Sequence, residues 1–482
     1  MVATVEPWEL VIVGGGPAGL AAALEARNHG ISTCLLDERP CLGGQIYKQF
    51  PAGFSVLEPR RLGRDHREGS RLIHAVEGSG ADVRTGSVVW GLWDKRVAYV
   101  RDDREAGVID ARCIILTPGA FDRPVAFPGW TLPGVMMAGG TKALAQNQRV
   151  LPGHRILVAG SGPLILALSA ELQRLGASLA SVLEAAPRPS LARMLRLLAR
   201  SRGNEVLLAD AVRYWTRLSA HRVPFTYSSM VVRAEGDGRV QQAVVARVDR
   251  DWRVVPGTET AMDVDTICLG YGFQASTELS RLCKCRQRYD EDNGGYIPVR
   301  DEWMRTSVPG VLSAGDGSGI GGSRIAIEEG ALAGIGAALE LGRIRPEQAR
   351  LRARPHLQRL RLMRRFREVL DEIYRVGPGI YDLAGPETIV CRCEDVTAGD
   401  LERAIIEDGV ADPDILKGLT RAGMGLCQGR YCARQIAAMI ARHSGVSTDQ
   451  VGPAAIRPPV KPVPIDAIAE ERPEAPLSVH IA

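Results

Sequence analysis

The chain has 482 residues, of which 45% are apolar and 24% charged, so its length allows two to four domains with large cores. The formal net charge is +4, yet residues 343–375 hold eleven arginines against four acids, which leaves −3 for the remainder (4 − 7). This distribution excludes a general nucleic-acid surface and indicates one local basic element. The longest apolar stretch, ILVAGSGPLILAL, is too short for a transmembrane segment, and no signal peptide is visible. We therefore expect a cytoplasmic protein, associated with a membrane only through a complex.

Three segments of the chain each predict a buried strand, followed by a glycine-rich turn and a helix. They are residues 9–38, 154–185 and 308–339. They predict an α/β fold with two Rossmann-like dinucleotide-binding domains, one inserted in the other, and a small helical domain after them. The expected boundaries are 1–120 with 275–342 for the first domain, 121–274 for the second, 343–385 for a basic helical connector, 386–450 for the cysteine-containing domain and 451–482 for a Pro-rich tail.

The first segment carries a G-x-G-x-x-G turn formed by Gly14, Gly16 and Gly19. In such a turn the first glycine permits the tight bend, the second lets the backbone approach a pyrophosphate, and the third allows close helix packing. The phosphates then lie on the helix N-terminus, whose free N–H groups favour anions. Asp37 ends the second strand, where a carboxylate can bind ribose hydroxyls, and Glu38 is the neighbouring alternative.

Three further turns extend this pattern: Gly43-Gly44-Gln45, the Thr-Pro-Gly turn that ends at Gly119, and Gly315-Asp316. The set resembles the FAD-binding pattern of glutathione- and thioredoxin-reductase-like flavoproteins, which usually have Ala-Thr-Gly where this chain has Thr-Pro-Gly. By that resemblance Asp316 contacts the ribityl chain or pyrophosphate, Gln45 lies beside the isoalloxazine ring, and the backbone near Ile325 faces the pyrimidine edge. The residues that the resemblance assigns to FAD are Gly14, Gly16, Pro17, Ala18, Gly19, Asp37, Glu38, Gly44, Gln45, Gly119, Gly315, Asp316, Ile325 and Ala326.

The second segment repeats the turn with Gly160, Gly162 and Glu184, but Ile165 replaces the third glycine. An isoleucine there keeps the helix and the strand further apart and makes pyrophosphate binding less certain. Two interpretations stay open: a site for NAD or another adenine nucleotide, or a domain kept for packing. No arginine pair after Glu184 marks a 2′-phosphate pocket, so NAD is favoured over NADP.

A Pro- and Arg-rich connector, residues 343 to about 355, leads to an amphipathic helix with apolar residues between Leu357 and Ile373. This helix is either solvated or a surface for a partner subunit, with membrane or nucleic-acid binding as a minor alternative. The tail RPPVKPVP predicts an extended arm rather than a packed element.

Four cysteines follow the helix in the spacing C-x-C-x33-C-x4-C: Cys391, Cys393, Cys427 and Cys432. Cys427 and Cys432 have the spacing of a flavoprotein redox disulfide, but they lie beyond both nucleotide domains. Two close pairs of thiolates can hold a [2Fe–2S] cluster, which Lys417, Arg421 and Arg430 could stabilise. The spacing resembles the bacterioferritin-associated-ferredoxin-like [2Fe–2S] domain. A four-cysteine zinc site and no metal are the alternatives.

Over most of its length the order of these motifs resembles the α-type subunit of multi-subunit amino-acid and opine dehydrogenases, a group with opine oxidases, hydroxyproline and proline dehydrogenases and hydrogen cyanide synthase. The resemblance implies a subunit that binds FAD and the cluster and relays electrons from a C–N bond. A partner of the D-amino-acid-oxidase type would oxidise the amine, and a small third subunit is possible. The alternatives are a self-contained NAD(P)H-dependent reductase that feeds its own cluster, and a scaffold with structural nucleotides. The sequence shows no catalytic triad or paired carboxylates.

Overall fold

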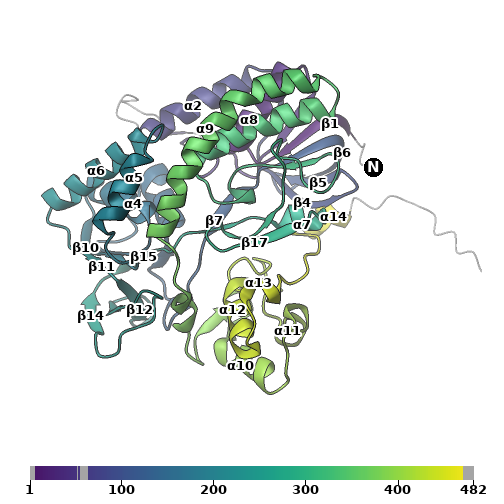
Figure 1. The fold of residues 1–482 in the computed structure, drawn as a ribbon. Coiled ribbons are helices and arrows are strands. Elements are labelled where there is room, and N and C mark those ends of the chain that lie inside the picture. The colour runs from purple at the N-terminus through teal and green to yellow at the C-terminus, as the bar shows by residue number, and fades with distance from the viewer. Residues whose placement is uncertain (1–5, 51–52, 55–62, 470–482) are drawn as a thin grey trace, which may run out of the picture.

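The computed structural model describes residues 6–50, 53–54 and 63–469, and it has two mainly parallel β-sheets covered by helices, with a small helical unit at the C-terminal end (Figure 1). The predicted α/β class is therefore confirmed. Among the helices that the structure describes, none is long and apolar enough to cross a membrane.

The first sheet has seven strands in the order β3-β2-β1-β6-β5-β4, and β19 also pairs with β6. Leu10, Val11 and Ile12 of the central strand β1 are fully buried, which explains why the sequence of this strand is a continuous apolar run. The strands are β1 (Glu6–Val13), β2 (Thr33–Leu36), β3 (Asp82–Arg84), β4 (Ser87–Trp93), β5 (Arg96–Arg101), β6 (Glu105–Leu116) and β19 (Val311–Ser313).

Two helices of this first unit cross at very close range. A side chain at Gly330 would put its Cβ 2.1 Å from the carbonyl oxygen of Ala18, so only glycine allows the approach. The contact sets the beginnings of α1 (Pro17–Asn28) and α8 (Ser323–Glu340) near one another; α1 follows β1, and α8 follows β19 after the turn at residues 314–322. The helices of this unit are α1 (Pro17–Asn28), α2 (Arg64–Glu77), α7 (Glu278–Leu282), α8 (Ser323–Glu340) and the 3-10 helix η3 (Gly315–Ser318).

The second sheet is parallel throughout, in the order β11-β10-β9-β15-β8, and a three-stranded antiparallel sheet, β12-β13-β14, lies beside it. Two short pairs, β7 with β16 and β17 with β18, complete the strands of both units. The strands are β7 (Ala120–Asp122), β8 (Val135–Met137), β9 (Arg155–Gly160), β10 (Ser178–Glu184), β11 (Phe225–Tyr227), β12 (Ser229–Glu235), β13 (Gln242–Arg247), β14 (Thr260–Asp263), β15 (Thr266–Gly270), β16 (Phe273–Ala275), β17 (Gln287–Asp290) and β18 (Gly295–Pro298). The helices are α3 (Ala138–Lys142), the π-helix η2 (Ala143–Gln148), α4 (Pro163–Arg174), α5 (Leu191–Ala199) and α6 (Glu205–Ala220).

The basic segment forms one long helix, α9 (Pro346–Ile373), so the prediction of a connector as far as about residue 355 is wrong. Pro355 lies inside the helix, where its missing N–H weakens the backbone ladder, but the buried Ala349 and Ala353 hold that turn against the first unit. Arg359 forms two bonds with Glu328 of α8, at 2.7 and 2.9 Å. The apolar stripe of α9 therefore packs on the rest of the protein. Part of the positive charge of the helix is paired with acids of the same chain.

The C-terminal unit shares one core cluster with the second sheet. Trp130 donates its indole N–H to the carbonyl of Ile389 at 2.6 Å, which joins the two parts. Thr397 and Asp400 form a capping box at the start of the first helix of this unit. The elements are η4 (Pro378–Asp382), β20 (Ile389–Cys391), β21 (Val396–Thr397), α10 (Ala398–Ile406), α11 (Pro413–Thr420), α12 (Ala433–Ser444) and α13 (Thr448–Val451).

The described part of the tail is packed, which corrects the prediction of a free extended arm. Val460 is 1% exposed, and its N–H donates to the carbonyl of Trp90 at 2.9 Å. The short helix α14 (Ile465–Ala469) places Ala467 in a small core with Trp90 and residues of β5. The apolar side chains of the tail fill a site formed by β4, β5 and β6, which no local pattern in the tail indicates. Residues 470–482 of the predicted tail lie outside the described residues.

Candidate functional site

The first glycine turn joins β1 to α1 and is shaped by close contacts. Gly14 has φ +106°, and a Cβ there would lie 2.3 Å from the carbonyl oxygen of Thr117. A Cβ at Gly19 would lie 1.8 Å from the carbonyl oxygen of Gly14. At Gly16 the nearest atom to a Cβ is the Cα of Gly44, at 3.8 Å. The turn is therefore tight where its glycines bend the chain and open where a pyrophosphate would approach.

The predicted ribose ligand Asp37 is engaged with the backbone. Its carboxylate accepts hydrogen bonds from the N–H groups of Gly15, at 2.5 Å, and Arg39, at 2.7 Å. Asp37 is 5% exposed, and burial raises its pKa. The neighbouring Glu38 pairs with Lys461 of the tail. Asp37 thus braces the glycine turn, and the tail reaches the end of the site where the sequence predicts a ribose.

The second glycine turn faces the first. A Cβ at Gly44 would lie 2.8 Å from the Cα of Gly16 and 3.5 Å from Pro17, so this approach requires a glycine at position 44. Gly43 has φ +110°, which bends the chain back toward Tyr47. Gln45 is exposed.

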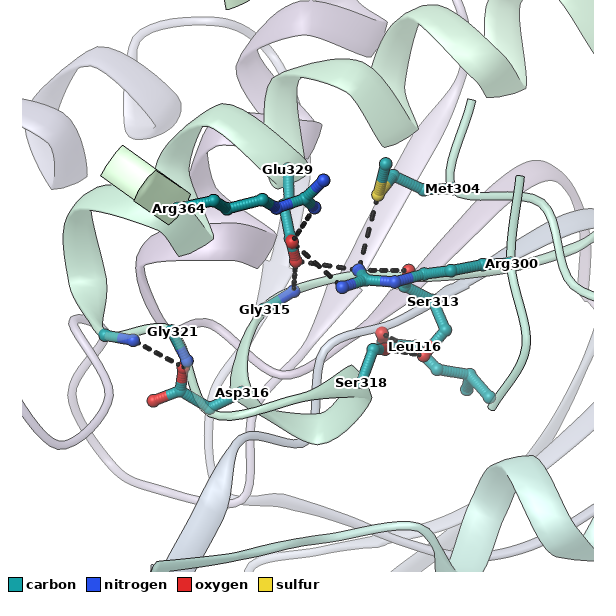
Figure 2. Close-up of polar contacts among 11 residues, drawn as sticks. Leu116, Arg300, Met304, Ser313, Gly315, Asp316, Ser318, Gly321, Glu329 and Arg364 are labelled. Carbon is teal, nitrogen blue, oxygen red and sulfur yellow. Dashed lines mark hydrogen bonds and ion pairs between the residues drawn. The ribbon is translucent and has the colours of Figure 1, made fainter. Parts of the chain in front are cut away.

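The third part of the site is the turn after β19, shown in Figure 2. Asp316 is partly buried, and one oxygen of its carboxylate accepts hydrogen bonds from the N–H groups of Gly321, at 2.9 Å, and Gly322, at 2.8 Å. Burial raises the pKa of Asp316. A Cβ at Gly315 would lie 2.9 Å from that of Ala18 and 3.5 Å from that of Ala326. The structure thus brings the turns before α1 and α8 together, and Ile325 and Ala326 lie in the first turn of α8.

A buried ion-pair network, which none of the sequence motifs predicts, supports this turn. Glu329, 2% exposed, accepts hydrogen bonds from the N–H of Gly315 at 3.0 Å and from two nitrogens of Arg300 at 2.7 and 2.8 Å (Figure 2). Arg364 of α9 binds the same carboxylate at 2.9 Å. The available signal was the Glu-Glu pair at 328 and 329, because two acids in the apolar α8 require partners. Gly119, with φ +74°, lies where its Cβ would meet no atom within 4 Å.

The second nucleotide turn is covered. Gly162 has φ +97°, and a Cβ there would lie 3.8 Å from Cγ of Tyr374, which follows α9. Glu184, 2% exposed, accepts hydrogen bonds from the N–H groups of Gly162 and Ala186, both at 2.9 Å. Burial raises the pKa of Glu184 to about 7. Ile165 fills the space of the third glycine, since a Cβ at Gly160 would lie 2.8 Å from its Cγ2.

The four predicted cysteine ligands meet in two pairs within the C-terminal unit. The thiol of Cys391 lies beside that of Cys432, and the thiol of Cys393 lies beside that of Cys427. Cys391 also accepts a hydrogen bond from the N–H of Gly423 at 3.4 Å. The contact with Cys432 lowers the pKa of Cys391 to about 6 and raises that of Cys432. Each half of the C-x4-C motif is therefore paired with one cysteine of the C-x-C motif.

Within the described part of the chain, no three His, Cys, Asp or Glu side chains converge on a single metal position. Of the basic residues expected near the sulfurs, Arg421 pairs with Glu394 at 2.9 Å and Arg430 with Glu278 at 2.6 Å. A cavity of about 110 Å³ lies beside this region, between β7 and the cysteine loop. Its lining includes Phe121 on one side and Gly429 on the other.

Known proteins resemble the chain along nearly its whole length. The family model "Pyridine nucleotide-disulphide oxidoreductase" matches residues 8–334, and "Sarcosine oxidase A3 domain" matches residues 386–472. The HcnB subunit of the hydrogen cyanide synthase of Pseudomonas aeruginosa is 35% identical over 467 residues, covering 95% of this chain and 97% of that protein. One of the subunits of the opine oxidase of Rhizobium meliloti is 32% identical over 476 residues, covering 96% and 88%. The crystal structure of L-proline dehydrogenase from P. horikoshii covers 96% of this chain and 80% of its own, with a TM-score of 0.68 and 22% identity, a likeness of fold.

Proposed function

Because the chain belongs to the pyridine nucleotide-disulphide oxidoreductase family and is a flavin-dependent oxidoreductase, we propose that it is the FAD- and [2Fe–2S]-containing subunit of a multi-subunit amino-acid or opine dehydrogenase. The complex acts on CH–NH or CH–NH2 donors. A partner subunit oxidises the C–N bond, and this chain relays the electrons. The near-complete alignments with subunits of hydrogen cyanide synthase and opine oxidase support this assignment.

The position of the cysteine loop beside the first nucleotide unit carries the proposal. Gly429, between Cys427 and Cys432, lines one cavity with Phe121, and Phe121 lies two residues after Gly119 of the predicted FAD site. Arg430 donates to the carbonyl of Cys427 at 3.3 Å and pairs with Glu278, so the loop is anchored on the first unit. Two redox groups held in these places would be neighbours, as an electron relay requires.

The residues of the first turn fit FAD. A Cβ at Gly16 would meet no atom closer than 3.8 Å, so a pyrophosphate can approach the backbone there, and no side chain caps the free N–H groups at the N-terminus of α1. Gly321 and Gly322 bind one carboxylate oxygen of Asp316 (Figure 2). The second oxygen is free of these bonds and can accept a hydrogen bond from a hydroxyl of the ribityl chain. FAD, when bound, supplies the change between two-electron and one-electron transfer.

The cysteines fit a [2Fe–2S] cluster better than a single metal ion. Each iron of such a cluster takes two cysteine ligands, and the chain presents two pairs, Cys391 with Cys432 and Cys393 with Cys427. A structural zinc ion would instead require four donors around one point. A Cβ at Gly425 would lie 2.2 Å from that of Cys393, so the loop is packed closely around this pair.

The amine would be oxidised on a D-amino-acid-oxidase-like flavoprotein, and a small third subunit would complete the complex. The second nucleotide turn takes no part in this scheme. Tyr374 lies on the open side of Gly162, where the pyrophosphate of NAD would have to approach, and Glu184 is already bonded to the turn. This disfavours the alternative of a self-contained NAD(P)H-dependent reductase.

Anaerobic reduction of the complex, purified with its natural partners and screened with amines, tests the proposal. We expect an amine to bleach the flavin absorbance and to produce the EPR signal of a reduced [2Fe–2S] cluster in this chain. NADH should leave both unchanged. Rapid bleaching of the flavin by NADH would instead establish the self-contained reductase. If an amine substrate left the flavin and the cluster of this chain oxidised, the chain would be a scaffold and not an electron relay.

A further inference from the structure

Helix α5 carries an apolar stripe that the chain leaves exposed. Of its nine residues only Leu197 is buried. Leu191, Met194, Leu195 and Leu198 are 75%, 40%, 57% and 53% exposed, at positions i, i+3, i+4 and i+7 of one helix face. A helix this short is marginal in water without a surface to cover it.

The following helix enlarges the apolar surface. In α6, Val206, Val212 and Trp215 are 45%, 64% and 43% exposed. The two helices meet at one cluster, where Leu197 and Leu208 pack against the end of α9. Exposed apolar patches of roughly a few hundred Å² are often functional on a protein surface.

The rim of this surface is positively charged. Arg200 of the α5 end binds Glu368 and the carbonyl of Arg365, which brings the solvent side of α9 to the edge of the patch. Within the described residues, four arginines on or near this edge make no ion pair: Arg193, Arg202, Arg361 and Arg365. A second copy docking face to face would set these like charges against one another, whereas a partner with an acidic rim would pair them.

The patch also adjoins the predicted flavin site. Arg324, one residue before Ile325, donates hydrogen bonds to the carbonyl of Gly203 at 2.7 Å and to the side chain of Asn204 at 3.4 Å. The loop that joins α5 to α6 is thereby fixed to the first turn of α8. A protein bound to α5 and α6 would therefore lie next to the predicted flavin site.

We infer that the exposed face of α5 and α6 docks the amine-oxidising flavoprotein subunit, through an apolar centre and an acidic rim on that partner. This inference rests on the proposed function, since it assigns a place to the partner that the function requires. The partner covers Leu191, Met194, Leu195 and Leu198, and its acids pair with the free arginines of the rim.

The test compares matched surface variants in the complete complex, purified from the native host through a tag on this chain. Leu195→Glu/Leu198→Glu places two charges in the α5 stripe. Ile415→Glu/Leu419→Glu does the same on α11, where the side chains are 57% and 60% exposed. Leu351→Glu, at a residue of α9 that is 73% exposed, is the neutral control. Flavin content and thermal unfolding of each free chain verify that it folds.

We expect the α5 variant to retain less than about a tenth of the flavoprotein partner, while the other two variants retain it fully. Arg361→Glu/Arg365→Glu should slow association most at low salt. A photo-cross-linker at position 191 should capture the partner. Full retention of the partner by the α5 variant, or its loss in the α11 variant alone, would overturn the docking surface but leave the proposed function standing.

Two other results would assign the face to a different occupant and overturn the inference. One is a dimer of this chain that the α5 variant converts to a monomer with the partner still bound. The other is a cross-link from position 191 within the same chain. A wild-type complex that contains no amine-oxidising subunit would overturn the proposed function itself, together with the docking surface.

Discussion

At the scale of single residues, buried carboxylates decide how each nucleotide turn is built. Asp37 and Glu184 occupy equivalent places, and each accepts a hydrogen bond from its glycine turn. Gly16 is partly exposed, whereas Gly162 is buried and has Tyr374 as its nearest neighbour on the side where a Cβ would point. The difference between the turns therefore comes from a residue that follows α9 and not from the glycine pattern itself.

Glu184 should make the stability of the protein depend on pH. Its pKa is about 7 in the folded chain against 4.5 unfolded, so folding takes up a proton between these values and stability falls as the pH rises through them. In Glu184→Gln this loss should be absent. Between pH 4.5 and 8 the wild type should therefore lose up to about 3 kcal/mol more unfolding free energy than the variant does. Parallel pH profiles in urea titrations would contradict this.

The cysteine pairs predict how iron is lost. Cys427→Ser and Cys432→Ser each remove one ligand from a different pair, so either change should abolish the bound iron and the EPR signal while FAD stays bound. Cys283→Ser, at a thiol outside the C-terminal unit, is the control. Iron analysis and EPR of the purified chains measure the effect, and a cluster that survives both changes would refute the assignment.

At the scale of elements, the tail and α9 differ most from the sequence predictions. Both contain prolines, which predict breaks or extended chain, yet both are held by tertiary contacts. Pro355 is accommodated within α9, and Val460 is inserted beside β4. Burial of small and apolar side chains against a surface supplied elsewhere outweighs the local preference.

Val460→Asp should show that the tail supports the first nucleotide site. Val460 is 1% exposed, so a carboxylate there is buried without a partner, and we expect a loss of about 2–4 kcal/mol in unfolding free energy. Lys461 would be released from Glu38 at the same time, which should weaken FAD retention. Ile465→Asp, at a residue that is 84% exposed, should change neither. Thermal unfolding and the FAD-to-protein ratio after gel filtration distinguish the two variants.

At the scale of the whole molecule, the C-terminal unit is not an independent appendage. Its core is continuous with that of the second sheet, and its cysteine loop contacts the first unit through Arg430. The second nucleotide fold, although its turn is covered, thus forms the base on which the cysteines are positioned.

Trp130→Ala tests this continuity. Trp130 is 3% exposed and donates to Ile389, two residues before Cys391, so its removal should cost about 3–5 kcal/mol and lower the iron content. Trp93→Ala, at a residue that is 40% exposed, should be close to neutral. If iron stayed fully bound in a destabilised Trp130→Ala chain, the C-terminal unit would fold without the second sheet.

The sequence by itself determined the α/β class, both glycine turns and the set of four cysteines, because each depends on residues that are neighbours along the chain. Only the tertiary structure decided how the cysteines pair, that Tyr374 covers the second turn, and that Glu329 joins Arg300, Arg364 and the Gly315 turn. These contacts join segments that are distant in sequence, so no local periodicity or spacing encodes them. Which nucleotide turn is open, and which helix face is uncovered, are properties of packing.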